Sequence, residues 1–153
     1  SPEKAFERAQ FLCARQERCS DDIRKKLLQW KVSESNIDKI IKKLIADGFI
    51  NDERYALMFA RDKSKFNKWG PLKIAYALKL KHFSEDNIKS ALKEIEEVND
   101  QSQLVEILSK KAKSIKAKTS YDLKVKLIRF AVSRGFDYGQ VNKAVAVLIK
   151  SDL

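Results

Sequence analysis

The stretch IDKIIKKL (residues 37–44) places apolar side chains at positions i, i+3, i+4 and i+7, the spacing of a helix with one buried face. The same spacing recurs in IKSALKEI (88–95) and in VNKAVAVL (141–148). These stretches begin 51 and 53 residues after the one before. Because strand-like alternation is nearly absent, the pattern predicts an all-α chain with an internal repeat. A single bundle whose helices are similar by coincidence is the alternative.

The repeated unit is longer than one helix. We call each of these apolar stretches a stripe. Fourteen residues before the start of each stripe stands an apolar residue (Ile23, Ile74 and Leu127), and another follows it by four positions (Leu27, Leu78 and Ala131). A second helix is therefore expected before each stripe, and a further helical segment before that one, at residues 2–16, 52–65 and 101–116. In the middle segment we expect Tyr55, Met58 and Phe59 to face inward. The predicted fold is all-α, with three tandem three-helix repeats (1–50, 51–98 and 99–153) forming an elongated, curved array.

Residue types at the expected helix ends fit this division. Ser20, Ser33, Ser84, and Thr119 or Ser120, are typical N-caps, because a side-chain oxygen satisfies the free amides of a first turn. Gly70-Pro71 is a strong helix start, while Gly48 and Gly135 are plausible stops. The border at residues 98–100 is polar and is expected to form a short hinge.

Composition excludes several classes of protein. The 153 residues carry a formal net charge of +11, which favours a polyanionic partner such as nucleic acid. No run of about 18 apolar residues and no N-terminal leader is present, so a cytoplasmic protein without a membrane is expected. The start at Ser1-Pro2, directly before a helix, leaves open whether a segment precedes it. Cys13 and Cys19 are expected to be reduced, structural thiols.

We find no residues for a catalytic, cofactor or metal site. No glycine-rich loop is available to hold a nucleotide, and one histidine with two cysteines does not complete a zinc site. We therefore expect no enzyme activity, no cofactor and no metal. A small hydrolase that uses His82 is the least supported alternative, since no partner for that histidine can be named.

Charge is concentrated in two stretches. Residues 61–81 hold seven Lys or Arg against Asp62 alone, and residues 110–134 hold nine against Asp122 alone. Cations on one face of an elongated array would neutralise phosphates without reading bases, and Trp69 could stack on a base. The candidate interface residues are Lys63, Lys65, Lys68, Trp69, Lys73, Lys110, Lys111, Lys113, Lys118, Lys126, Arg129 and Arg134. An ordinary solvated surface, with Trp69 packed inside, is the other interpretation.

Three stretches resemble the RecX family, which modulates the RecA recombinase. They are RCSDDIRKKL (18–27), LIADGFINDERYA (44–56) followed by WGPLKI (69–74), and YDLKVKL (121–127) with SRGF (133–136). The chain departs from the family at Asn51, where an acidic residue is usual, and at Lys31 and His82, where a glycine is expected after the second helix. The turn geometry at those two residues is therefore open.

This resemblance implies a non-enzymatic regulator that docks in the groove of the RecA filament on single-stranded DNA. Inhibition is the expected effect, and stimulation of recombination is the open alternative. It implies restraint of filament extension and of the filament's ATPase, strand-exchange and co-protease activities, in DNA repair, homologous recombination and the SOS response. We expect a monomer. The alternative is a stand-alone DNA-binding helical-repeat protein, because a three-helix unit can place a helix in the major groove.

Overall fold

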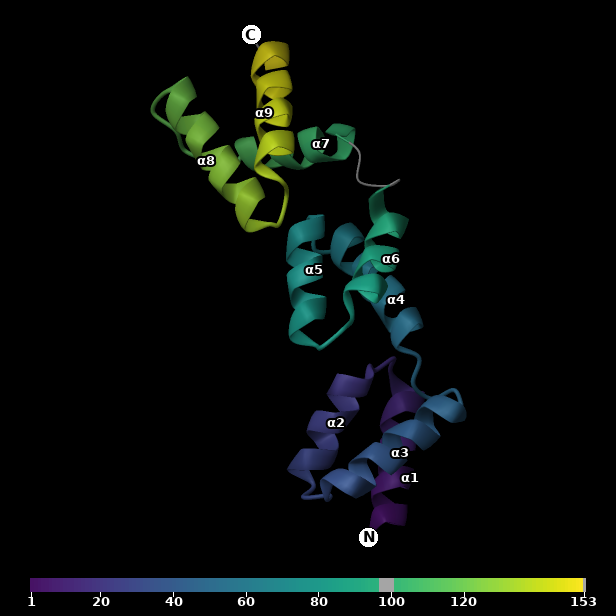
Figure 1. Cartoon of the computed structure of the whole chain (residues 1–153). Helices are drawn as coiled ribbons and strands as arrows, with labels where there is room; N and C mark the ends of the chain where they lie inside the picture. The colour runs from purple at the N-terminus through teal and green to yellow at the C-terminus, as the bar shows by residue number, and fades with distance from the viewer. Residues whose placement is uncertain (97–100, 153) are drawn as a thin grey trace.

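The chain forms an elongated array of helices. A computed structural model describes residues 1–96 and 101–152, and within those residues it contains nine α-helices and no strand. The helices are α1 (Pro2–Arg15), α2 (Ser20–Gln29), α3 (Glu34–Ala46), α4 (Asp52–Lys65), α5 (Pro71–Leu80), α6 (Glu85–Glu96), α7 (Gln101–Ala112), α8 (Ser120–Ser133) and α9 (Tyr138–Asp152). Figure 1 shows successive groups of three helices along the array, with the two termini at opposite ends.

Each group of three helices has its own hydrophobic core. We call α1–α3 unit 1, α4–α6 unit 2 and α7–α9 unit 3. The cores centre on the paired residues of the repeat, which are fully buried: Ile23 and Leu27, Ile74 and Leu78, Leu127 and Ala131. The predicted all-α array of three three-helix units is thus confirmed. The unit borders at residues 50/51 and 98/99 stay predictions, and the second border, with its expected hinge, lies outside the described residues.

The second helix of each unit ends in the same turn. The residue after the C-cap has a left-handed backbone in all three: φ is 60° at Lys31, 64° at His82 and 97° at Gly135. The amide that follows reaches back five residues, to Leu27, Leu78 and Ala131 respectively, at 3.1 to 3.2 Å. Lys31 and His82 therefore adopt the conformation that glycine adopts in unit 3, despite the cost of a Cβ there.

Some details differ from the sequence-based expectation. Met58 does not face inward: its side chain is 44% exposed, and α4 instead buries Ala56 and Ala60. The physical reason is the close packing of α4 on α6, which leaves room only for small side chains between them. In addition, α7 ends at Ala112 and not at residue 116, and Cys19 is the N-cap of α2, with Ser20 inside the helix.

Polar contacts join unit 1 to unit 2. The C-terminal end of α5 meets the N-terminal end of α2, where Lys81 Nζ lies 2.9 Å from Asp22 Oδ1 and His82 Nδ1 lies 2.8 Å from Asp21 Oδ1. Burial of Lys81 lowers its pKa, but the hydrogen bond to Asp22 and the charges of Asp22 and neighbouring acidic groups together outweigh burial and raise it. Cations at a helix C-terminus and anions at a helix N-terminus are both favoured by the helix dipole.

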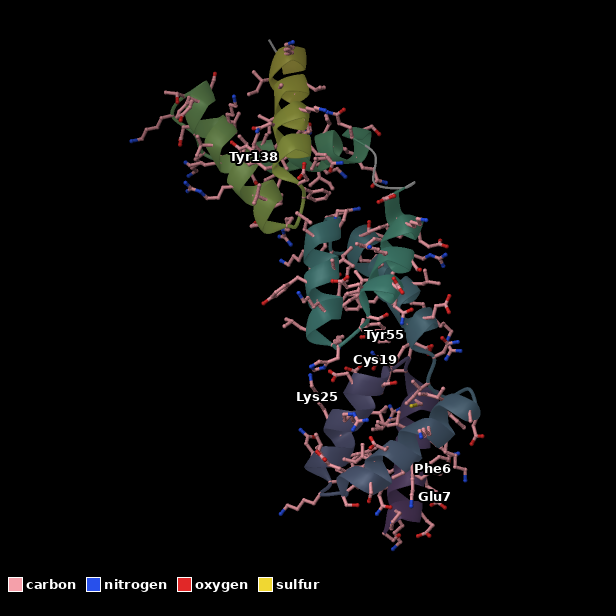
Figure 2. The ribbon with its side chains drawn as sticks, in the orientation of Figure 1. Phe6, Glu7, Cys19, Lys25, Tyr55 and Tyr138 are labelled. Carbon is pink, nitrogen blue, oxygen red and sulfur yellow. The ribbon has the colours of Figure 1, made fainter. Side chains whose placement is uncertain are left out.

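Two further bonds support this joint. The Ser20 amide donates to Asp52 Oδ1 at 2.8 Å, and Arg54 pairs with Glu17. Cys19 and Tyr55 lie at the same boundary (Figure 2), and burial raises the pKa of the Cys19 thiol to about 12. Both cysteines are free, and the Cys19 thiol is protonated at neutral pH. Cys19 is therefore a structural residue of the joint.

Backbone contacts join unit 2 to unit 3. The amide of Gly70 donates to the carbonyl of Arg134 at 2.7 Å, and that of Leu72 to Gly135 at 3.0 Å. A Cβ added at Gly70 would stand 2.5 Å from the Gly135 oxygen, so these two segments of the backbone touch only because both positions are glycine. The free amides of the first turn of α5 thus bind the free carbonyls at the end of α8. Figure 1 shows α2, α5 and α8 along one side of the array, and the bonds described above link the ends of successive helices.

The ionic joint is expected to weaken in acid. Burial raises the pKa of Asp21, but hydrogen bonds from Lys25 and His82 outweigh burial and hold it below its ordinary value. A carboxyl group with a lowered pKa stabilises the folded state above its unfolded pKa, and this contribution disappears as the pH falls through its folded pKa. We expect a loss of about 1 kcal/mol of unfolding free energy from this group below about pH 4.

Urea unfolding of the wild type and of Asp21→Asn, at neutral and at acid pH, tests this expectation. The variant should be the less stable protein at neutral pH and should lose less stability on acidification. Asp38→Asn is the matched control, because Asp38 pairs with Arg24 inside unit 1 and touches no joint. If the Asp21 variant lost as much stability in acid as the wild type, the joint would not be the acid-sensitive element.

Candidate nucleic-acid interface

The loop between α4 and α5 folds back on the end of α4. The Trp69 amide donates to the Lys63 carbonyl at 3.0 Å, and Lys68 takes a left-handed backbone with φ of 58°. Gly70 and Pro71 then begin α5. This local path sends consecutive residues to different surroundings, because Trp69 packs on unit 2 while Lys68 reaches unit 3.

Trp69 is half-buried and covered by two lysines. Its ring meets the Phe59 ring edge-on at 6.4 Å between centroids. Lys63 Nζ and Lys73 Nζ each lie 4.8 Å from the centre of the Trp69 ring, within range of a cation–π interaction. A base that stacked on Trp69 would compete with these ammonium groups for the ring, which now contacts both lysines.

A groove of about 360 Å³ lies where unit 2 meets unit 3. Lys68 from the α4–α5 loop faces Lys110 and Lys111 of α7 across it. Apolar atoms come from Ile107 and Phe130, and the remaining lining residues are Gln103, Glu106 and Ser114. The groove thus brings together cations from both basic stretches of the sequence.

Phe130 is the aromatic centre of this groove. Lys111 Nζ lies 4.8 Å from the centre of the ring, and the guanidinium carbon of Arg134 lies 5.2 Å from it. Glu106 is 3.6 Å from Lys110, and both of these side chains are exposed, so the pair is weak and leaves Lys110 free to bind another anion, although Glu106 offsets one positive charge of the groove. An aromatic ring among cations is the surface that binds single-stranded nucleic acid by stacking and phosphate contacts.

The other candidate residues lie apart from the groove. Lys126 is already engaged: its Nζ lies 3.1 Å from Asp122 Oδ2 and donates to the carbonyl of Lys116 at 2.8 Å. The hydrogen bond from Lys126, with another from the Lys118 amide, lowers the pKa of Asp122. Lys126 therefore fixes the α7–α8 loop. The remaining candidates are exposed on other surfaces: Lys65, which lies over the Phe66 ring, Lys113, Lys118 and Arg129.

Sequence reasoning missed the part that Phe130 plays, since a hydrophobic residue on an amphipathic helix is expected in the core. Phe130 is only partly buried at the edge of the unit 3 core. One signal was available, because Arg134 follows Phe130 by four positions and residues so spaced meet on a helix surface.

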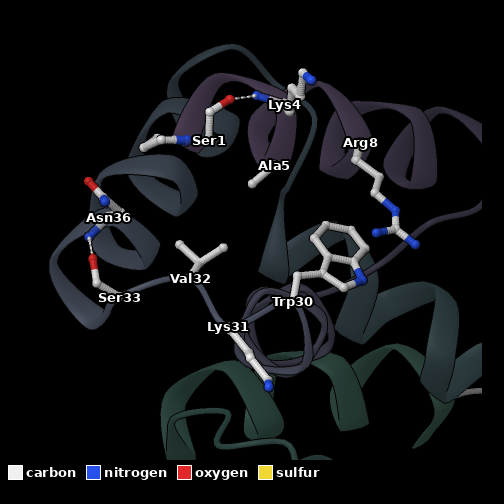
Figure 3. A pocket seen from close by; sticks show the side chains of 10 residues that line it. Ser1, Lys4, Ala5, Arg8, Trp30, Lys31, Val32, Ser33 and Asn36 are labelled. Carbon is white, nitrogen blue, oxygen red and sulfur yellow. Dashed lines mark hydrogen bonds between the residues drawn. The ribbon is translucent and has the colours of Figure 1, made fainter.

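A second basic hollow, of about 370 Å³, lies in unit 1 between α1 and the α2–α3 turn. Figure 3 shows the Arg8 guanidinium beside the Trp30 ring, and the distance from its carbon to the ring centre is 4.1 Å. Lys4 and Lys31 also line this hollow. Trp30 packs against the unit 1 core, so its ring serves packing first.

Residues 1–96 and 101–152 contain no cluster of three or more His, Cys, Asp or Glu side chains that could hold a metal ion. In the same ranges no helix is both long and apolar enough to cross a membrane.

Comparison with known proteins decides the family. Family models match the chain at residues 51–92, as the second three-helix domain of RecX, and at residues 99–145, as the third. The regulatory protein RecX of Pelodictyon phaeoclathratiforme is 30% identical over 84% of this chain and 79% of its own length. The chain belongs to the RecX family.

Other RecX proteins agree with this assignment. The regulatory protein RecX of Clostridium perfringens is 33% identical over 86% of this chain, and the chain spans 62% of that relative's length. A crystal structure of RecX from Lactobacillus salivarius superposes with a TM-score of 0.84 over 96% of both chains, at 23% identity. At that identity the likeness shows the shared fold. RecX proteins are regulatory proteins by name, and the groove between units 2 and 3 lies within the two matched domains.

Proposed function

We propose that this chain regulates a RecA recombinase by binding the filament that RecA forms on single-stranded DNA. Binding restrains filament extension, and with it ATP hydrolysis, strand exchange and co-protease activity. Membership of a family of regulatory proteins named for RecX supports the regulatory role. The observation that carries the binding mode is the groove at the unit 2–unit 3 joint, with Lys68, Lys110 and Lys111 around Phe130.

The shape and charge of the molecule fit a filament better than a small molecule. The molecule is an elongated array with a net charge of +11, and phosphates attract such a charge without regard to sequence. The groove is open and lined by flexible lysines, unlike the enclosed apolar pocket that binds a metabolite. We place the DNA strand across the joint, with phosphates at the lysines and a base against Phe130.

The test of this function is ATP hydrolysis by the cognate recombinase on single-stranded DNA, with the chain titrated from far below to above filament stoichiometry. A fall in turnover at low stoichiometry is expected, as is a smaller effect at higher salt. Unchanged turnover at both salt concentrations would contradict the proposal. If the chain then bound DNA without recombinase, the stand-alone DNA-binding protein would be the better description.

Charge reversal in the groove is expected to weaken filament binding strongly. The variant Lys68→Glu/Lys110→Glu/Lys111→Glu removes three cations that face phosphates. Since each lost phosphate contact lowers the slope of log affinity against log salt by about 0.7 on a single strand, the slope should fall by about 2. Fluorescence anisotropy with filaments on labelled DNA, over a series of salt concentrations, measures both affinity and slope.

The matched control changes the net charge by the same amount elsewhere. Lys39, Lys42 and Lys89 are exposed on α3 and α6, away from the joint. Their triple reversal to Glu should leave the salt slope nearly unchanged, because it alters only the long-range attraction. Equal effects of the two variants would mean that net charge, and not the groove, governs binding. Lys126→Glu/Arg129→Glu tests in the same way whether the outer face of α8 also binds.

A further inference from the structure

Helix α5 is apolar on the side that faces solvent. It buries Ile74 and Leu78 in the unit 2 core, yet Leu72, Tyr76 and Leu80 are 60%, 64% and 59% exposed. A spacing of four residues places these three side chains along one side of the helix, opposite the core. A helix that is apolar on both sides is normally buried on both. We define the α5 face as Leu72, Tyr76 and Leu80.

Positive charge flanks the α5 face. On the helix surface Lys73 lies on one side of this face and Lys79 on the other, and the sequence of α5 contains no Asp or Glu. Lys81, at the end of the helix, is paired with Asp22 of unit 1. The face therefore combines an apolar ridge with cations that no carboxylate of α5 balances.

These properties select among possible occupants. A second copy of the chain would bring lysines against lysines between two bodies of net charge +11, which opposes a symmetric contact. Nucleic acid would use the lysines and the tyrosine, but phosphates and bases offer nothing that favours Leu72 and Leu80. An amphipathic helix with an apolar stripe and acidic edges satisfies both the ridge and the cations.

We propose that the α5 face binds an acidic amphipathic helix of the recombinase protein, while the groove at the unit 2–unit 3 joint binds DNA. This inference rests on the proposed function, since it assigns the protein side of the same filament contact. The two surfaces adjoin, because α5 begins at the Gly70–Arg134 backbone bond. One array thus contacts both components of the filament at once, and the two contacts are separable by mutation.

The first experiment replaces the apolar ridge without changing charge. The variant Leu72→Ser/Tyr76→Ser/Leu80→Ser should bind the recombinase filament at least about tenfold more weakly, and bind a single-stranded oligonucleotide without recombinase as the wild type does. The matched control is Phe11→Ser/Tyr138→Ser/Val147→Ser, which removes three exposed apolar side chains from units 1 and 3. The control should bind filaments normally, and circular dichroism should show equal helix content in all three proteins.

The second experiment identifies what touches the face. A benzoylphenylalanine placed at position 76 is irradiated in the presence of filament, and the crosslinked peptides are sequenced by mass spectrometry. A crosslink to an acidic helical segment of the recombinase supports the proposal. Crosslinking to DNA or to a second copy of the chain would overturn it.

Failure of this inference is distinguishable from failure of the proposed function. If the wild type binds the filament and the ridge variant binds it equally well, the α5 face is not the protein contact, and the proposed function stands. If the wild type does not bind the filament, both proposals fail together.

Discussion

Alanine at position 135 is expected to destabilise the protein by about 2 to 3 kcal/mol and to loosen unit 3 from unit 2. Gly135 has a φ of +97°, which L residues rarely adopt, and a Cβ there would stand 2.4 Å from the Lys73 Cβ and 2.5 Å from the Lys73 nitrogen. The backbone of α5 must therefore move away, and both backbone hydrogen bonds of the joint, from Gly70 to Arg134 and from Leu72 to Gly135, lengthen. The backbone conformation and the collision act in the same direction.

Two probes of urea unfolding distinguish the loosening of unit 3 from a general loss of stability. Both tryptophans, Trp30 and Trp69, lie in units 1 and 2, whereas circular dichroism reports all three units. In Gly135→Ala we expect helix loss to begin at lower urea than the change in tryptophan fluorescence. Gly48→Ala is the control, because Gly48 has a similar φ of +81° but no atom within 4 Å of the added Cβ. It should cost about 1 kcal/mol, and an equal cost for both variants would show that the joint yields freely.

Leu78→Ala is expected to lower the unfolding free energy by about 3 kcal/mol. Leu78 is fully buried in the unit 2 core and packs among Ile74, Ile88 and Ile95, so truncation leaves a cavity that these stiff side chains cannot close. Thermal or urea unfolding followed by circular dichroism measures the loss.

Leu80→Ala is the matched control for Leu78→Ala, since it makes the same chemical change two residues along the same helix. Leu80 is 59% exposed, so this variant should stay within about 0.5 kcal/mol of the wild type. By the inference above it should nevertheless weaken filament binding. If Leu78→Ala lowered the unfolding free energy by less than about 1 kcal/mol, the unit 2 core would relax more than its packing suggests.

The fold was predictable from the sequence because the information is local and repeated. The stripe at residues 37–44 and its two later copies mark the third helix of each unit, and a fixed offset finds the second. The first helix was harder. In α4 the large residues Tyr55 and Phe59 suggested an inward face that included Met58, but the residues of α4 that are buried in the unit 2 core are Ala56 and Ala60. Small residues give a weak periodic signal even where they lie deepest.

The candidate site was predictable only in part. The two basic stretches were visible as composition, but their meeting at one groove depends on Lys68 taking a left-handed backbone and on two glycines touching across 65 residues of chain. Neither fact leaves a periodic trace in the sequence. Likewise, the capture of Lys126 by Asp122 and by the α7–α8 loop depends on where that loop returns. Charge is readable from sequence, whereas its placement is a property of the folded chain.

The three separate cores also bear on how such a protein changes over evolutionary time. No hydrophobic cluster of the described residues crosses from one unit to the next, and the units meet through ionic pairs and backbone bonds near helix ends. Duplication or deletion of a terminal unit would therefore disturb one joint and leave every remaining core intact. Chains of this architecture can change length in steps of about 50 residues, with no need to repack an interior.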